Sequence, residues 1–344
     1  MSEIEAASGN GGPTPEQLAE LRSSLAELRG ELEARFGPQR ERTGASPFRV
    51  LDELGNSLRS GLDKLGVSGL YSGLRRLVSA YRMDNRSLEV DEFGSDPLYL
   101  EKSRVLLDFL FDRWWRVKVS GAEHLPSGGR VLLVANCSGI LPYDALMIAH
   151  AVERFHPNQL RPRFLAADWI ATLPFAQPLL TRLGGVRACP ENAERLLRTG
   201  HWVVTFPEGQ KGAVKPFRQR YQLQRFGRGG FVSLALRLDA TVVPVAVVGA
   251  EEVHPVLLDP TLPRRLLGVP LPVTPTFPVA GPLGLIPLPS QWRIRFGEPI
   301  RWDAVAREKA GDALYVNRAR DQIRNTIQLL LDEEVHRRTG VFRS

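Results

Sequence analysis

Short runs of consecutive apolar residues alternate with amphipathic segments from residue 117 onward. Runs of this length without polar interruption are typical of strands buried on both faces of a sheet. They predict strands over residues 131–136, 163–167, 202–206, 242–248 and 292–296. Between them, apolar positions at helical spacing predict helices over about 144–154, 190–199, 225–238 and 312–338. This alternation predicts an α/β domain over residues 117–344, with a mostly parallel sheet flanked by helices.

The N-terminal third of the chain has a different pattern, which predicts a helical region over residues 14–116 and a disordered tail over 1–13. Leucines three and four residues apart predict a helix over 14–36, which supports either a homo-oligomer or packing on the main domain. Residues 47–82 separate leucines from basic residues, as in a helix that lies on a membrane surface or packs on a domain. A further helix begins near Pro97 and carries bulky residues that pack on or beside the α/β domain.

An uncharged, proline-rich stretch interrupts the α/β domain at residues 266–291. A helix that crosses a bilayer needs about 20 apolar residues. Repeated prolines rule out an ordinary helix here, because each one removes a backbone donor and clashes with the preceding turn. The stretch therefore predicts an apolar loop that lies in a membrane interface or covers an apolar tunnel.

Length and composition favour one large domain, since the chain has 344 residues of which 43% are hydrophobic. The formal net charge of +7 favours an anionic partner, such as phospholipid headgroups, a phosphorylated small molecule or nucleic acid. The two cysteines, Cys137 and Cys189, lack the spacing of a metal site or a disulfide framework, so we expect no bound metal. The acidic, glycine-containing N-terminus lacks the features of an export signal, so we expect a cytoplasmic protein.

Two polar clusters follow predicted strands and carry the candidate chemistry. The first is the segment 136–144, which includes Cys137 and Asp144. The second is the tight-turn segment 206–209, which contains Glu208. Because the carboxyl ends of parallel strands meet at one edge of a sheet, both clusters are expected at the same edge.

These clusters resemble sequence blocks of the lysophospholipid and glycerol-phosphate acyltransferases. In that family a histidine is followed after a short gap by an aspartate, and a later block reads phenylalanine, proline, glutamate, glycine. Here the later block is Phe206 to Gly209, and Val242 to Ala246 resembles a fourth block, which is a strand with a proline. Residues 183–190 resemble the remaining block, and the order and spacing of the blocks match across about 117–300.

The resemblance implies an acyltransferase that moves a fatty acyl group from an acyl thioester to a hydroxyl of a lysophospholipid or glycerol-phosphate-type acceptor. The implied donor is acyl-CoA or an acyl carrier protein, and no further cofactor is implied. The family's histidine acts as general base, with the aspartate, here Asp144, orienting it. The residues implied in holding the acceptor and its phosphate are Glu208, Gly209, Lys211, Lys215 and Arg187.

The chain departs from the family pattern at the histidine position, which holds Cys137. Six residues separate Cys137 from Asp144, where four are usual. A free thiol has a pKa of about 8.5, so it is a poor base near pH 7 but a possible nucleophile. Cys137 and Asp144 are therefore the candidate catalytic residues of an altered active site. The alternative is a catalytically silent relative that binds or presents lipids.

Another histidine is a candidate substitute base. His201 precedes the strand that leads to Glu208, which puts it at the opposite sheet edge, and His150 lies too far along the helix after Asp144. His254 follows the proline-containing strand and therefore falls on the same edge as the two clusters. A loop histidine of this kind is more often structural or solvated than catalytic.

A run of basic residues follows the second cluster, with no acidic residue between positions 210 and 238. Such a run favours phosphate recognition and binding to an anionic bilayer, where each surface Lys or Arg contributes about 1 kcal/mol. No nucleic-acid-binding motif accompanies it, so nucleic acid is not an expected partner. We therefore expect a protein that is peripheral on the cytoplasmic face of a membrane. The basic residues are Lys211, Lys215, Arg218, Arg220, Arg225, Arg228 and Arg237.

Overall fold

The computed structural model of the chain describes residues 90–139, 141–167, 176–256, 287–338 and 340. The chain forms two compact units, residues 1–68 and 69–344, and all described residues lie in the second. The predicted tail, the helices predicted at 14–36 and 47–82, and most of the proline-rich loop lie outside the described residues.

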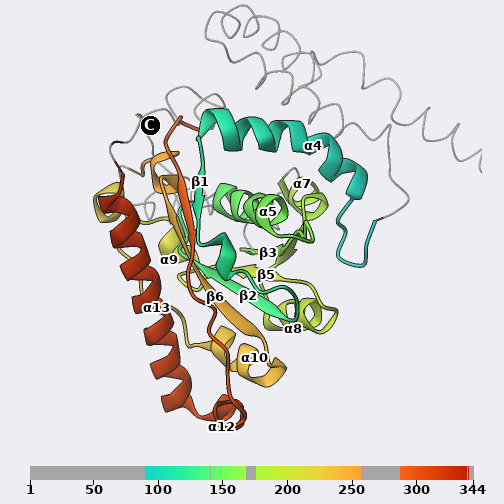
Figure 1. Cartoon of the computed structure of the whole chain (residues 1–344), viewed down its shortest axis with the longest axis vertical. Helices are drawn as coiled ribbons and strands as arrows, with labels where there is room; N and C mark the ends of the chain where they lie inside the picture. The colour runs from blue at the N-terminus through green and yellow to red at the C-terminus, as the bar shows by residue number, and fades with distance from the viewer. Residues whose placement is uncertain (1–89, 140, 168–175, 257–286, 339, 341–344) are drawn as a thin grey trace, which may run out of the picture. The chain divides into compact units, whose positions relative to one another are not determined.

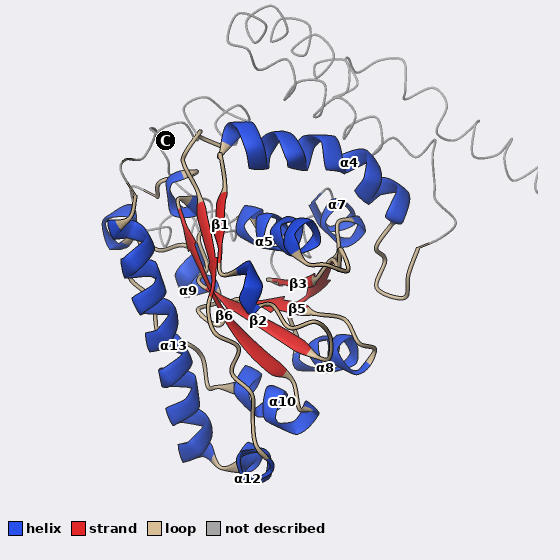
Figure 2. Ribbon diagram, viewed as in Figure 1, coloured by secondary structure: helices blue, strands red, loops and turns tan. Residues whose placement is uncertain are grey.

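Seven strands of the described chain form one sheet, which Figure 1 and Figure 2 show at the centre of the molecule. Their order across the sheet is β1-β7-β6-β2-β5-β3-β4. Strands β2 to β6 run parallel, while β7 is antiparallel to β6 and parallel to β1. The predicted α/β fold with a mostly parallel sheet is therefore confirmed. The strands are β1 (Lys118–Ser120), β2 (Val131–Ala135), β3 (Arg163–Ala166), β4 (Gly185–Arg187), β5 (Val203–Thr205), β6 (Thr241–Val248) and β7 (Arg293–Phe296).

Helices cover both faces of this sheet. Helices α8, α10 and α13 share one hydrophobic cluster with alternate residues of β2 and β6, such as Leu132, Val134 and Val242. Helix α5 contacts β3 and β5, and Figure 2 shows it across the sheet from α13. The helices are α4 (Pro97–Phe109), α5 (Tyr143–Phe155), α7 (Ala176–Arg182), α8 (Pro190–Arg198), α9 (Gln210–Ala213), α10 (Gly230–Leu238), α12 (Ala304–Glu308) and α13 (Ala313–His336).

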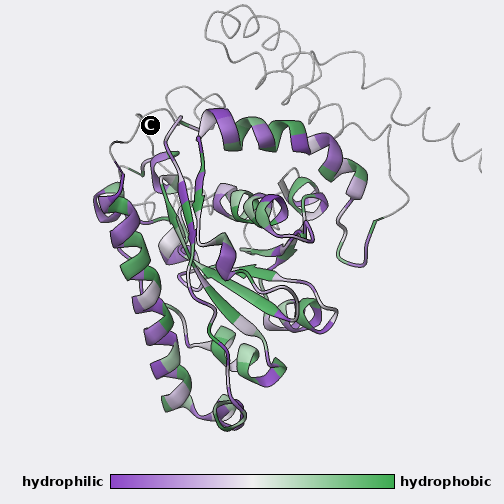
Figure 3. Cartoon of the chain, in the orientation of Figure 1, coloured by the Kyte–Doolittle hydropathy of each residue, from purple (hydrophilic) through white to green (hydrophobic). Residues whose placement is uncertain are grey.

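The central strands form the core because they are apolar on both faces. Every residue of β2 is buried, and Figure 3 shows the central strands in hydrophobic colours. Helix α13 instead alternates between the two colours, since Ile323, Ile327 and Leu331 recur at helical spacing on its buried side. Trp115 is fully buried and stacks on Trp292 with ring centroids 4.5 Å apart, which joins the end of the α4 region to the sheet.

The predicted strands and helices agree closely with the structure except at one helix start. The apolar pattern predicted a helix from 225, but α10 begins at Gly230. The residues before Gly230 are held elsewhere, since the Gly227 amide donates to the Pro207 carbonyl (3.1 Å) and the Gly227 carbonyl accepts from Arg320 (3.1 Å). Contacts with the Glu208 turn and with α13 therefore keep this segment out of the helix.

None of the described helices combines the length and the apolar character that crossing a bilayer requires.

Candidate active site

The carboxyl ends of the parallel strands bring the two predicted clusters together. The first cluster leaves β2, the second leaves β5, and β2 pairs directly with β5. The segment after β6, which contains Glu251 and His254, enters from the other side of β2. A crevice outside the carboxyl ends of strands, where neighbouring connections diverge, is the usual site in open α/β sheets.

Asn136 fixes the start of the first cluster. Its side chain is fully buried, donates to the Val247 carbonyl (3.0 Å) and accepts from the Val247 amide (2.8 Å). These two bonds satisfy backbone groups of β6 where β2 ends, so the loop leaves the sheet in a defined direction.

Glu208 braces the loop that carries Cys137. One of its carboxylate oxygens accepts from the Cys137 amide (2.8 Å), and the other accepts from the Gln224 amide (2.7 Å). The following Gly209 has a φ of 59°, a left-handed conformation that suits glycine in this tight turn. The Glu208 side chain has no exposed surface, so its carboxylate positions two loops.

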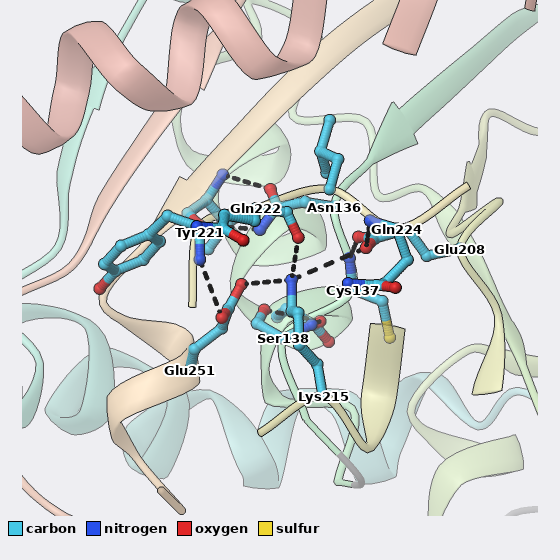
Figure 4. A network of polar contacts seen from close by, with 12 residues as sticks. Asn136, Cys137, Ser138, Glu208, Lys215, Tyr221, Gln222, Gln224 and Glu251 are labelled. Atoms are coloured by element: carbon cyan, nitrogen blue, oxygen red, sulfur yellow. Dashed lines mark hydrogen bonds and ion pairs between the residues drawn. The ribbon is translucent and has the colours of Figure 1, made fainter. Parts of the chain in front are cut away.

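Lys215 balances the buried carboxylates, and Figure 4 shows its ammonium at the centre of the network. Its Nζ atom lies 3.0 Å from the Glu251 carboxylate and 3.7 Å from the Glu208 carboxylate, and it donates to the Gln222 carbonyl (3.1 Å). Burial raises the pKa of the Glu251 carboxyl to about 7, which Lys215 opposes. The Lys215 side chain is 2% exposed, so the structure places it beneath the surface of the site.

Asp144 lies in the first turn of α5 and is bonded to the first cluster. Its Oδ2 atom accepts from both the amide and the hydroxyl of Ser138, each at 2.9 Å, and its Oδ1 atom accepts from the Ala145 amide at 2.8 Å. Burial raises the pKa of the Asp144 carboxyl to about 6, while the hydrogen bonds from Ser138 and Ala145 lower it. This carboxylate is therefore a stronger base than an exposed aspartate.

Cys137 is partly exposed, and Figure 4 shows its sulfur directed away from the Lys215 ammonium. Burial of the thiol raises its pKa well above the usual value, and the negative charges of Asp144 and Glu208 raise it further. The thiol is therefore neutral near pH 7, which makes it a poor base and a poor nucleophile in this environment.

Two cavities meet around the first cluster. The larger, of about 110 Å³, is mostly apolar and is lined by Cys137 and Asp144 together with residues that follow β3, β4 and β5. The smaller, of about 10 Å³, is more polar, and its lining includes Ser138, Lys215 and His254. The first cavity suits an apolar chain or a thioester, and the second has room for one small polar group.

The histidines occupy the places that the sequence suggested. The His254 ring lies at the site and stacks on the Tyr143 ring with centroids 6.0 Å apart. His150 instead bonds Asp108 (2.9 Å) on a buried face of α5. His201 lies before β5, at the opposite edge. His254 is thus the histidine of this group that lines the smaller cavity.

The remaining candidate binding residues are more exposed. Lys211 lies in the first turn of α9 and Arg187 ends β4, so both flank the edge where the clusters meet, as does Gly209. Lys215 differs from them because its charge is used inside the network. Among the described residues, no group of three or more His, Cys, Asp and Glu side chains suits a metal ion.

Sequence reasoning gave no role to Ser138, Gly212 or Gln224. A Cβ atom on Gly212 would lie 2.6 Å from the Glu208 Cβ and 2.9 Å from the Cys137 Cβ, so only glycine lets α9 approach both. A glycine shortly after a tight turn is a recognisable signal for such close approach. The bond from the Gln224 amide has no sequence signal, because every residue except proline carries a backbone N–H group.

Both clusters lie in a segment of the chain that matches a known family. A family model described as Acyltransferase matches residues 116–248, which include both clusters and β6. The chain is 49% identical over 255 residues to an uncharacterised protein of Mycobacterium leprae, which covers 74% of this chain and 70% of that protein. It is 48% identical over 255 residues to uncharacterised proteins of Mycobacterium bovis and Mycobacterium tuberculosis, which covers 74% of this chain and 71% of each relative.

Among solved structures, the chain is similar to a 1-acyl-sn-glycerophosphate acyltransferase of Thermotoga maritima. The sequence identity is 16% and the TM-score is 0.45, with 83% of this chain and 96% of that chain covered.

Proposed function

Residues 116–248 form an acyltransferase-family domain, and we propose that the chain is an enzyme that transfers a fatty acyl group from an acyl thioester to a hydroxyl of a lysophospholipid or glycerol-phosphate-type acceptor. The proposed donor is acyl-CoA or an acyl carrier protein, and the reaction needs no further cofactor. One observation carries the proposal: the Glu208 turn braces the Cys137 loop beside an apolar cavity, inside the segment that matches the family.

The two cavities suggest how the substrates divide the site. The apolar cavity next to Cys137 suits the thioester and the first part of an acyl chain. The exposed cations Lys211 and Arg187 flank the same edge and suit the phosphate of the acceptor, since charge-assisted hydrogen bonds to phosphate are strong. Glu208 and Lys215 are buried beneath the surface of this site and support it by holding its loops in place.

A second candidate function is favoured by one specific observation, the neutral thiol at the position where the family has a histidine. In this second function, the protein lacks a catalytic base and binds or presents lipids without turnover. Two groups at the site can nevertheless supply a base, namely His254 and the Asp144 carboxylate. An imidazole ordinarily has a pKa of about 6.5, which suits general base catalysis at neutral pH.

We also propose that the protein binds peripherally to the anionic surface of the cytoplasmic membrane face. Six basic residues that follow the Glu208 turn are exposed, and surface Lys and Arg side chains are attracted to anionic lipid headgroups. A membrane-bound position would give the apolar cavity access to lipid acceptors. The six residues are Lys211, Arg218, Arg220, Arg225, Arg228 and Arg237.

The test is release of free CoA thiol from long-chain acyl-CoA, measured with and without lysophosphatidate or glycerol 3-phosphate. We expect release that depends on the acceptor. Glu208→Gln removes one of the two carboxylate oxygens that accept from buried amides, which costs about 1 to 3 kcal/mol. We therefore expect the rate of acceptor-dependent release to fall by roughly 10- to 100-fold.

The matched control is Glu334→Gln, which alters a buried carboxylate paired with Arg293 and Arg295 away from the site. Its activity should stay near that of the wild type. Acceptor-dependent release that is equal in both variants would contradict the role of the Glu208 turn. Lipid binding without release by the wild type, with every donor and acceptor, would favour the second candidate.

A further inference from the structure

We propose that Ser138 relays the proton of the acceptor hydroxyl to Asp144, which serves as the general base in place of the family's histidine. This inference rests on the proposed acyl transfer and assigns a further catalytic residue to it. The geometry that carries it is the hydrogen bond from the Ser138 hydroxyl to the Asp144 Oδ2 atom.

The Ser138 hydroxyl is held in the orientation that a relay requires. It donates to Asp144 at 2.9 Å, so its hydrogen is committed and its oxygen lone pairs remain to accept from an incoming hydroxyl. The Ser138 amide donates to the same Asp144 oxygen, which prevents the residue from turning away. The Ala145 amide holds the other oxygen of the carboxylate, so the pair is fixed from both sides.

The cavities place the two substrates on either side of this pair. Asp144 and Cys137 line the larger apolar cavity, whereas Ser138 lines the smaller polar one, and both cavities share Gly139 and Ala213. The smaller cavity holds about 10 Å³, which corresponds to roughly one water-sized group. An acceptor hydroxyl seated there would contact Ser138 while the thioester occupied the apolar side.

The chemical character of the two residues supports the assignment. Burial raises the pKa of the Asp144 carboxyl to about 6, close to that of an imidazole at about 6.5. At pH 7 the carboxylate is therefore mostly ionised yet basic enough to share a proton in the transition state. The Cys137 thiol is neutral at this pH, because burial and two nearby carboxylates raise its pKa. It therefore cannot serve as the general base.

The acceptor oxygen attacks the thioester carbonyl as its proton passes to the Ser138 oxygen, and the Ser138 proton passes to Asp144. The new ester C–O bond forms and the C–S bond breaks, so the electron pair leaves with sulfur. Asp144 then returns its proton through Ser138 to the leaving thiolate, which departs as a thiol.

The experiment compares Ser138→Ala with Ser138→Thr in the full-length protein, using acyl-CoA and lysophosphatidate at pH 5 to 8. Loss of the relay hydroxyl should lower kcat by about 10- to 100-fold, within the usual range for general base catalysis, and threonine should restore part of it. Ser233→Ala is the matched control, because its hydroxyl donates to the Ala310 carbonyl at 2.7 Å and belongs to α10. Thermal unfolding checks that each variant is folded.

The pH profile separates a catalytic role from a structural one. The wild type should lose kcat/KM below about pH 6, where Asp144 becomes protonated, and His254→Gln should keep this acid limb. Loss of the acid limb in His254→Gln would assign the base to His254 and overturn the relay. An acyl adduct on Ser138, seen by intact mass without acceptor, would also overturn it, since the serine would then be a nucleophile.

The remaining outcomes distinguish the relay from the function on which it rests. An active wild type with an equally active and folded Ser138→Ala variant would overturn the relay alone. A wild type that transfers no acyl group to any acceptor would overturn the acyl-transfer proposal, and the relay with it.

Discussion

The Cys137 thiol is the residue in which this site departs most from its family, and its charge state decides what it can do. Two carboxylates near the sulfur and its burial both favour the neutral form. Lys215, the nearest buried cation of the network, is engaged with Glu251 and the Gln222 carbonyl. The thiol therefore fills space beside the apolar cavity as a small, weakly polar group.

This charge state predicts a low reactivity of Cys137. Because the thiolate is the nucleophile and the pKa is raised, alkylation by iodoacetamide at pH 7.5 should be slower than in the urea-unfolded protein, by about tenfold or more. Intact mass of a Cys189→Ala variant measures the rate at Cys137 alone. Modification at pH 7 that is faster than in the unfolded chain would show a stabilised thiolate and contradict this account.

Glu251 predicts a pH dependence of stability. Its pKa is raised from 4.5 to about 7 in the folded state, so the folded protein binds this proton more tightly than the unfolded chain. Its contribution is fully present below about pH 4.5 and is lost as pH rises through about 7, a change on the order of 3 kcal/mol.

Glu251→Gln should therefore show a smaller decrease in the free energy of unfolding between pH 5 and pH 7.5 than the wild type. Urea unfolding at the two pH values measures this difference. The Asp144 carboxyl, whose pKa is raised to about 6, contributes in the same direction and remains in the variant. An unchanged decrease in Glu251→Gln would mean that Glu251 does not titrate in this range.

At the scale of elements, short helix α9 must approach both clusters closely. Gly212→Ala would force a Cβ atom against Glu208 and Cys137, at 2.6 Å and 2.9 Å, so one of the two loops must shift. We expect acyl transfer to fall by about tenfold or more, since small misplacements of a site are costly. The control is Gly230→Ala at the start of α10, where an added Cβ meets nothing within 4 Å.

Activity and thermal unfolding of the two variants test this packing constraint. Gly230→Ala should keep its activity and unfold at an equal or higher temperature, because alanine favours a helix over glycine. Equal activity of Gly212→Ala and Gly230→Ala would show that α9 tolerates the displacement and does not set the site geometry.

The elements differ in how far the sequence predicts them. Buried parallel strands such as β2 and β6 are recognisable in the sequence as continuous apolar runs, and their predicted limits agree with the structure within about one residue. Strands β1 and β4 were missed because each has three residues with a single valine among them, whereas β5, equally short, lies in a continuous apolar run. The start of α10 was placed too early, because the bonds that hold Gly227 depend on Pro207 and Arg320, which are distant in the chain.

Some parts of the candidate site can likewise be predicted from the sequence and others cannot. The edge at which Cys137, Glu208 and His254 meet follows from strand order and was predictable. The bond from Ser138 to Asp144 was not, because it depends on how the longer loop between them folds back. Neither was the burial of Lys215, which looks in the sequence like the other basic residues of its run but points into a network with two carboxylates.

At the scale of the whole molecule, net charge predicts the mode of membrane association. The formal charge of +7 and the exposed basic run should draw the protein to anionic vesicles. Because salt screens exposed charges, raising ionic strength from about 0.1 to 1 M shortens the screening length from about 10 to 3 Å and should release part of the protein.

Flotation with vesicles of phosphatidylglycerol and phosphatidylcholine, and with phosphatidylcholine alone as the control, measures this binding. We expect binding to the anionic vesicles that falls with salt. Equal binding to neutral vesicles, or recovery only with detergent at every salt concentration, would contradict an association that is mainly electrostatic.

The most direct test of acyl transfer follows the acyl chain itself. Wild-type protein and Asp144→Ala are incubated with acyl-CoA that carries a labelled long chain and with lysophosphatidate, and the extracted lipids are separated. We predict label in phosphatidate with the wild type. Asp144→Ala should give less of this label by a factor of about 100 or more, since Asp144 is bonded to Ser138 at the centre of the site. Label that remains in acyl-CoA and free fatty acid with the wild type, or equal transfer by the folded variant, would contradict this account of the site.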